Sequence, residues 1–110
     1  MDQKTEQEMA AALDRLWVQF LPLMEERVAV LEEAAAAFDA NLLSEAQQRA
    51  ANVAAHKLAG SLGSFGLTRG TVLARELEIT YSQENSADPG TSADLTKLTA
   101  QLRKLIDQRK

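Results

Sequence analysis

The sequence predicts an all-α protein: an antiparallel four-helix bundle with an additional N-terminal helix. Apolar residues recur at spacings of three and four along most of the chain, which is the period of an amphipathic helix. No stretch of useful length alternates apolar and polar residues, as a half-buried strand does. Several amphipathic helices joined by short connections are typical of a helical bundle.

The first helix is expected over residues about 4–20 and the second from about Pro22. Proline ends or kinks a helix because it lacks the backbone N–H, but it is tolerated in a first turn. We expect the first helix to pack across one end or side of the bundle that the other four form. Its apolar residues are Met9, Leu13, Leu16, Trp17 and Phe20. Those of the second helix are Met24, Val28, Leu31, Ala35 and Phe38, before residues 39–41 break the pattern.

The third helix has signals at both of its ends. Ser44 is a candidate N-cap, and Gln47 three residues later completes a capping box. The helix is expected to run to about Leu62 or Phe65, because Gly66 is a typical terminator. Its apolar stripe consists of Ala50, Ala54, Leu58, Leu62 and Phe65.

Two further helices follow. The fourth is expected from about Thr68, with inward residues Leu73, Ala74, Leu77 and Tyr81. Residues 84–90 read as a loop, in which Pro89-Gly90 is the strongest turn signal. Ser92 is a candidate cap of the last helix, whose apolar residues are Leu95, Leu98, Leu102, Leu105 and Ile106. A single domain over residues 1–110 suits a chain of 110 residues.

Composition narrows the class of function. The net charge of −4 argues against nucleic-acid binding, since phosphate backbones are met by basic patches. The chain has no cysteine and one histidine, so no metal site is expected. No apolar run approaches the ~20 residues that span a bilayer, so no membrane contact is expected. The charged N-terminus lacks the apolar core of a secretory signal, which favours a cytoplasmic protein.

The one histidine, His56, lies in the third predicted helix. At 100° per residue it points about 200° away from Leu58, off the apolar stripe. Gly60 and Gly63 follow it by four and seven residues and share its face. A glycine inside a helix costs about 0.5–1 kcal/mol relative to alanine. The two glycines therefore favour close approach of something large to the imidazole, although a surface histidine, a core histidine and close helix packing are the plainer alternatives.

The run from His56 to Leu67 resembles the motif of histidine-containing phosphotransfer (HPt) domains, among them the phosphotransfer domain of chemotaxis histidine kinases. The residues that match the family pattern in register after His56 are Leu58, Gly60, Ser61, Phe65 and Gly66. The motif covers about 25 residues, and the order of the surrounding helices is compatible with the family. One departure stands out: the third position after the histidine, often lysine in the family, is Ala59, while Lys57 lies one residue after it.

The resemblance implies a phosphorelay intermediate rather than an enzyme. His56 would accept a phosphoryl group from a receiver-domain aspartate or a kinase and pass it to a response-regulator aspartate. Histidine titrates near neutral pH, so a neutral ring nitrogen is accessible for attack. The chain has no GxxxxGK[ST] nucleotide loop, and no cofactor is expected on it. The expected partners are receiver domains, which would carry the Mg²⁺, and a sensor or hybrid histidine kinase.

The remaining site residues follow from the same face of the third helix. Lys57 and Gly60 are expected beside the phosphoryl group, and a bulky residue at Gly60 is expected to block transfer while leaving the fold intact. The residues expected to dock the partner are Asn52, Val53, Gly63 and Ser64. Residues 25–27 on the preceding helix are candidates for the rim of the site. The alternative is a non-catalytic helical module that docks receiver or helical partners without phosphotransfer.

Overall fold

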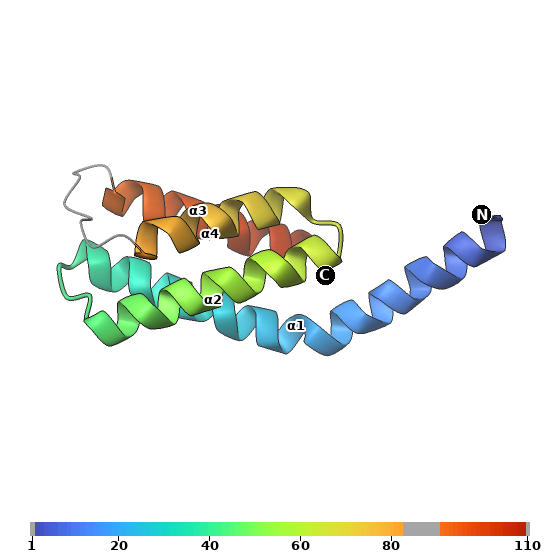
Figure 1. Ribbon diagram of the computed structural model, residues 1–110, viewed down its shortest axis with the longest axis horizontal. Coiled ribbons are helices and arrows are strands. Elements are labelled where there is room, and N and C mark those ends of the chain that lie inside the picture. Colours follow the sequence, from blue (N-terminus) through green and yellow to red (C-terminus); the bar gives the residue numbers. More distant parts are fainter. Residues whose placement is uncertain (1, 83–90, 110) are drawn as a thin grey trace.

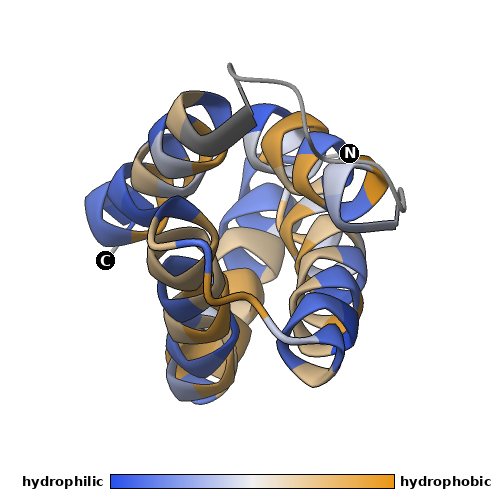
Figure 2. Ribbon diagram, turned by 90° about the vertical axis from the view of Figure 1, so that its left-hand side faces the viewer, coloured by the Kyte–Doolittle hydropathy of each residue, from blue (hydrophilic) through white to orange (hydrophobic). Residues whose placement is uncertain are grey.

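A computed structural model describes residues 2–82 and 91–109, which form four α-helices (Figure 1). They are α1 (Gln3–Asp39), α2 (Glu45–Ser64), α3 (Thr68–Ser82) and α4 (Thr91–Arg109). Successive helices run in opposite directions, and each packs on two neighbours, α1 on α2 and α4, and α3 on the same two (Figures 1 and 2). The prediction of an all-α fold with four packed helices is confirmed.

The prediction of an additional N-terminal helix is wrong, because α1 runs unbroken from Gln3 to Asp39 with Pro22 inside it. Proline removes one helical hydrogen bond, the one that an N–H at position 22 would donate to the carbonyl of Val18. Pro22 and Val18 both lie on the exposed side of the helix, where water can satisfy that carbonyl. The proline is therefore accommodated inside one helix and does not divide it into two.

The N-terminal part of α1 does not pack across the bundle either. It extends beyond the other three helices as an arm, residues 3–16 (Figure 1), and brings the longest dimension of the molecule to 53 Å. Trp17 is buried, at 2% exposed. The other four apolar residues expected to be inward are 39–52% exposed: Met9, Leu13, Leu16 and Phe20. The periodic pattern is thus present, but most of it has no partner within the described residues.

The core takes one stripe from each helix. From α1 and α2 the largest fully buried side chains are Trp17, Met24, Val28, Leu31, Leu58 and Leu62. The inward residues predicted for α3 are all buried, and from α4 Leu95, Leu102 and Ile106 join them. Ala50 is an exception, because it is exposed while Ala51 is buried. Phe65 is half-buried and meets the ring of Trp17 edge-on, with 5.3 Å between the centroids.

The predicted ends of α2 are correct. The hydroxyl of Ser44 accepts from the backbone N–H of Gln47, whose side chain accepts from the N–H of Ser44. At the other end Gly66 adopts φ of +76°, a left-handed conformation that glycine reaches without strain. By contrast, α4 begins at Thr91, so Ser92 lies inside the helix and is not its cap. The predicted loop over residues 84–90 lies outside the described residues.

Candidate functional site

His56 lies on the outer face of α2, at the point where α2 packs beside α3. Its side chain is 72% exposed, whereas Leu58, two residues on, is fully buried. This placement follows from the helical period, since residues two apart in a helix point to nearly opposite sides. The predicted orientation of His56 away from the apolar stripe is therefore correct, and the alternative of a core histidine is excluded.

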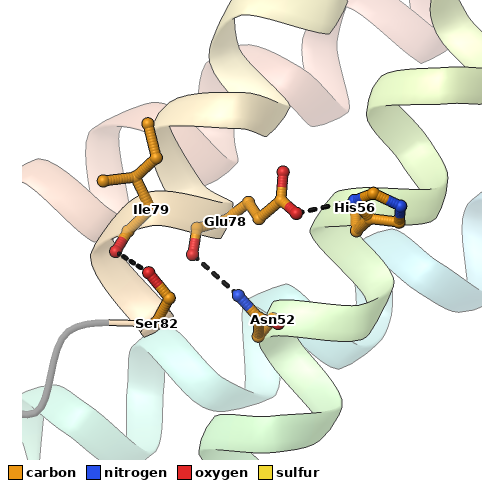
Figure 3. Close-up of polar contacts among 5 residues, drawn as sticks. All are labelled: Asn52, His56, Glu78, Ile79 and Ser82. Carbon is orange, nitrogen blue, oxygen red and sulfur yellow. Dashed lines mark hydrogen bonds and ion pairs between the residues drawn. The ribbon is translucent and has the colours of Figure 1, made fainter.

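Glu78 of α3 holds one nitrogen of the imidazole. Its Oε2 lies 2.6 Å from Nδ1 of His56 (Figure 3). A carboxylate only accepts hydrogen bonds, so the neutral ring carries its proton on Nδ1 and keeps a free lone pair on Nε2. In Figure 3 the second ring nitrogen lies on the side of the imidazole away from Glu78. In the neutral ring, this arrangement leaves the exposed nitrogen, Nε2, as the one with a lone pair.

Two side chains of α2, one and two turns before His56, also bind the backbone of α3. The amide Nδ2 of Asn52 donates to the carbonyl of Glu78 over 2.8 Å (Figure 3). One turn earlier, Nε2 of Gln48 donates to the carbonyl of Tyr81, also over 2.8 Å. These bonds fix the segment of α3 that bears Glu78, and with it the position of the carboxylate against the imidazole.

A shallow open depression surrounds the exposed side of His56. Residues of α1 and α2 line it: Arg27, His56, Lys57, Gly60, Ser61 and Ser64. A Cβ built on Gly60 would meet no atom within 4 Å, so this glycine leaves the approach to the imidazole open. Arg27 reaches in from α1 and donates from its guanidinium to Oγ of Ser61 over 3.3 Å. Two cations, Arg27 and Lys57, therefore border the histidine.

The predicted docking residues do not form one free surface. Val53 is 48% exposed, but it lines a separate depression toward the end of α3, with Tyr81 and Ser82. The amide of Asn52 donates to the backbone of α3. A Cβ on Gly63 would lie 3.2 Å from Oγ1 of Thr71, so the small size of Gly63 serves the contact between α2 and α3.

Sequence periodicity does not point to Glu78, and it offers Arg27 only as one of three rim candidates, residues 25–27, of which Arg27 lines the depression. Both belong to other helices than His56, so their distance along the chain, 22 residues for Glu78, does not show whether they lie beside it. Glu78 is 28% exposed and Arg27 is half-buried, as many surface residues are. In the sequence, each is a charged residue close to the apolar stripe of its helix. Many other charged residues share that position, so it does not identify a site residue.

Residues 2–82 and 91–109 contain no group of three His, Cys, Asp or Glu side chains placed to hold a metal ion. No helix among them is both long and apolar enough to cross a membrane.

Residues 15–110 match the family described as the Hpt domain. The chain belongs to the Hpt domain family. Hpt domains take part in histidine phosphotransfer in two-component phosphorelays, interact there with receiver domains, and are phosphoryl carriers generally not classed as enzymes. The family match begins at Arg15, two residues before the first buried side chain, so it excludes nearly all of the arm.

The Hpt chain is also similar to one curated protein, Protein RcaC of Microchaete diplosiphon. The two are 31% identical over 103 residues, which cover 94% of this chain and 16% of the relative. The chain therefore corresponds to about a sixth of that protein's length. No solved structure matches the chain.

Proposed function

We propose that His56 is the phosphoacceptor of this Hpt domain, and that it relays a phosphoryl group between aspartates of receiver domains. The observation that carries the proposal is the pairing of Nδ1 with Glu78 on an exposed ring, which leaves Nε2 unprotonated beside Gly60. A nitrogen nucleophile needs a free lone pair and an open path to phosphorus, and this ring has both.

In the forward step the lone pair of Nε2 attacks the phosphorus of an aspartyl phosphate. The Nε2–P bond forms while the P–O bond breaks, and the electron pair leaves with the aspartate carboxylate. With a proton on Nδ1 and phosphorus on Nε2, the imidazole of His56 becomes positively charged. The carboxylate of Glu78 opposes that charge across 2.6 Å and stabilises both the transition state and the phosphorylated ring. Attack by a second aspartate reverses the step.

The partner completes the site. Phosphoryl transfer depends mainly on positioning and on neutralising the charge of the phosphoryl oxygens. We infer that a receiver domain brings its Mg²⁺ to the depression, and that Lys57 adds a positive charge from this side. We expect the partner to contact Ser64 in the depression and the exposed Val53 beyond it, with Asn52 and Gly63 at the border with α3. The phosphate enters the relay from a sensor or hybrid histidine kinase, either directly or through its receiver domain.

The test is phosphotransfer from a panel of labelled phospho-receivers to the wild-type chain and to His56→Gln. We expect acid-labile, base-stable label on the wild type and none on the variant, which has lost the nucleophile. Circular dichroism and receiver binding serve as controls that the variant still folds and docks. Label on His56→Gln would disprove the assignment of the acceptor. Binding of a receiver without label on the wild type would identify a docking module that does not transfer phosphate.

A further inference from the structure

A second helix contributes a cation to the depression around His56. Arg27 comes from α1, which packs beside α2 (Figure 1). Its side chain is half-buried, and its guanidinium donates to Oγ of Ser61 over 3.3 Å. Ser61 directly follows Gly60, and all three residues line the same depression as His56. The bond to Ser61 thus holds the guanidinium at the edge of the proposed phosphoryl site.

Most N–H groups of the Arg27 guanidinium are not used by its bond to Ser61. It carries five N–H groups, and Ser61 accepts from one nitrogen. In the described part of the chain Arg27 takes part in no ion pair, in contrast to Arg103 and Arg109, each of which lies 2.7 Å from a carboxylate. Its charge is therefore not already neutralised by a carboxylate of the same fold.

A phosphoryl group on Nε2 would need that charge. At neutral pH it carries about −1.5 to −2, and Glu78 adds a further negative charge on the other side of the ring. On α2, the residues after His56 that share its neighbourhood supply one cation, Lys57, because Ala59 is uncharged and 5% exposed. The single positive charge of Lys57 is smaller than the negative charge of the phosphoryl group and Glu78 together.

The approach to the imidazole past Gly60 is open. Gly60 lies one turn after His56 on the same face, and outside its own helix backbone no atom lies within 4 Å of where its Cβ would be. A phosphoryl group on the exposed nitrogen would therefore face the depression that Arg27 also lines. The planar fork of arginine also matches two phosphoryl oxygens at once, which an ammonium group does not.

We propose that Arg27 is a phosphoryl-binding residue of the relay site. Its guanidinium, held by Ser61, donates to the oxygens of the phosphoryl group on His56. It supplies from α1 the positive charge that α2 lacks at Ala59. This inference rests on the proposed function of His56.

The test loads the chain without a partner, using potassium phosphoramidate as donor. The Nε2–P bond forms as the P–N bond of phosphoramidate breaks, and the leaving nitrogen takes a proton from solvent and departs as ammonia. Arg27→Gln is expected to load about tenfold more slowly, which corresponds to one lost hydrogen bond to a charged group. Arg69→Gln is the matched control, because it removes the same charge from a depression lined by α3 and α4.

Two further readouts separate phosphate binding from structural effects. The ³¹P chemical shift of the phosphorylated chain should move in Arg27→Gln and stay in Arg69→Gln. Ser61→Ala, which removes the hydroxyl that holds the guanidinium, should load more slowly than wild type but faster than Arg27→Gln. Thermal unfolding of each variant shows whether the bundle is intact, and Arg27→Lys, which keeps the charge, replaces Arg27→Gln if that variant does not fold.

The outcomes distinguish this inference from the function on which it rests. If the wild type takes no label, or His56→Gln takes as much, the proposed function fails. If the wild type is labelled on His56 while Arg27→Gln loads at the same rate with the same ³¹P shift, the role of Arg27 alone is disproved. Equal slowing by Arg27→Gln and Arg69→Gln would also disprove it, because the effect would then follow from net charge.

Discussion

The contact between His56 and Glu78 determines what the histidine can do. An exposed imidazole on its own exchanges its proton between two nitrogens and turns about its side-chain bonds. The carboxylate at 2.6 Å selects the form with the proton on Nδ1 and holds the ring in one orientation. If His56 is the phosphoacceptor that we propose, this contact makes Nε2 the atom that reacts.

At this scale we predict that Glu78→Gln slows phosphoryl transfer to His56 by about tenfold. The amide can still bond the ring, but it no longer opposes the positive charge that the ring gains, and charge-assisted hydrogen bonds are about twice as strong as neutral ones. The measurement is the rate of transfer from a phospho-receiver. Glu76→Gln, an exposed carboxylate of the same helix, is the control. Equal rates for Glu78→Gln and wild type would mean that the carboxylate does not act on the ring.

Among the elements, α2 and α3 form the contact that builds the site. Three glycines near this contact have different roles. Gly60 faces open space, Gly63 lies against Thr71, and a Cβ on Gly70 would lie 2.9 Å from Cδ1 of Leu62. Of the three, only Gly60 can therefore take a Cβ without displacing a side chain of another helix. The sequence treats Gly60 and Gly63 alike, and the packing of α3 separates them.

For Gly60→Leu we expect transfer to fall by at least about tenfold, because the longer side chain fills the approach to His56 and small misplacements of reacting atoms are costly. Stability should stay the same or rise by up to about 1 kcal/mol, since leucine is the better helix former. Gly60→Ala is the matched control and should transfer almost normally. Receiver-dependent labelling and urea unfolding measure the two effects. Normal transfer by Gly60→Leu would overturn the access argument.

The element that departs most from expectation is α1. Its first half carries an apolar stripe as regular as that of α2, yet Met9, Leu13 and Leu16 remain 39–52% exposed. The difference in length explains this: α1 has 37 residues, whereas α2 has 20 and α4 has 19, so the arm extends beyond the helices that pack against the rest of α1. The bundle ends near the ion pair between Asp14 of α1 and Arg109 of α4, which are 2.7 Å apart.

At the scale of the whole molecule, the apolar core encloses two polar atoms that have no hydrogen-bond partner among the described residues. They are Nε1 of Trp17 and the hydroxyl of Tyr81, which is 3% exposed as a residue. Burial raises the pKa of Tyr81 to about 12 from its ordinary value of 10, because the phenolate would lose its hydration. The folded state therefore binds this proton more tightly than the unfolded state does.

The stability of the folded state is therefore expected to fall at alkaline pH. The contribution of Tyr81 is complete below about pH 10, and it is lost as the pH rises toward 12, where the unfolded chain releases the proton first. We predict that Tyr81→Phe is as stable as wild type or up to about 1 kcal/mol more stable at pH 7, since it removes an unpaired hydroxyl. Urea unfolding at pH 7, 10 and 11.5 should show a smaller alkaline loss for the variant. Parallel losses in both proteins would contradict the prediction.

The sequence by itself determined the secondary structure of most of the chain and the identity of the family. The reason is that both depend on local patterns: the period of apolar residues, the Ser44–Gln47 cap, the break at Gly66, and the run that follows His56. These signals lie within a few turns of one another, and the exposed position of His56 follows directly from the period. Pro22 is the exception, because a proline signal alone does not show whether a helix ends or continues.

Only the tertiary structure decided which residues of other helices meet His56. Glu78 and Arg27 lie 22 and 29 residues away along the chain, and the angle and offset between packed helices bring them to one face. The same packing left most of the arm of α1 beyond the other helices and placed Gly63 against Thr71. Helical period gives each residue a direction within its own helix, whereas the relative placement of helices depends on the fit of all their side chains together.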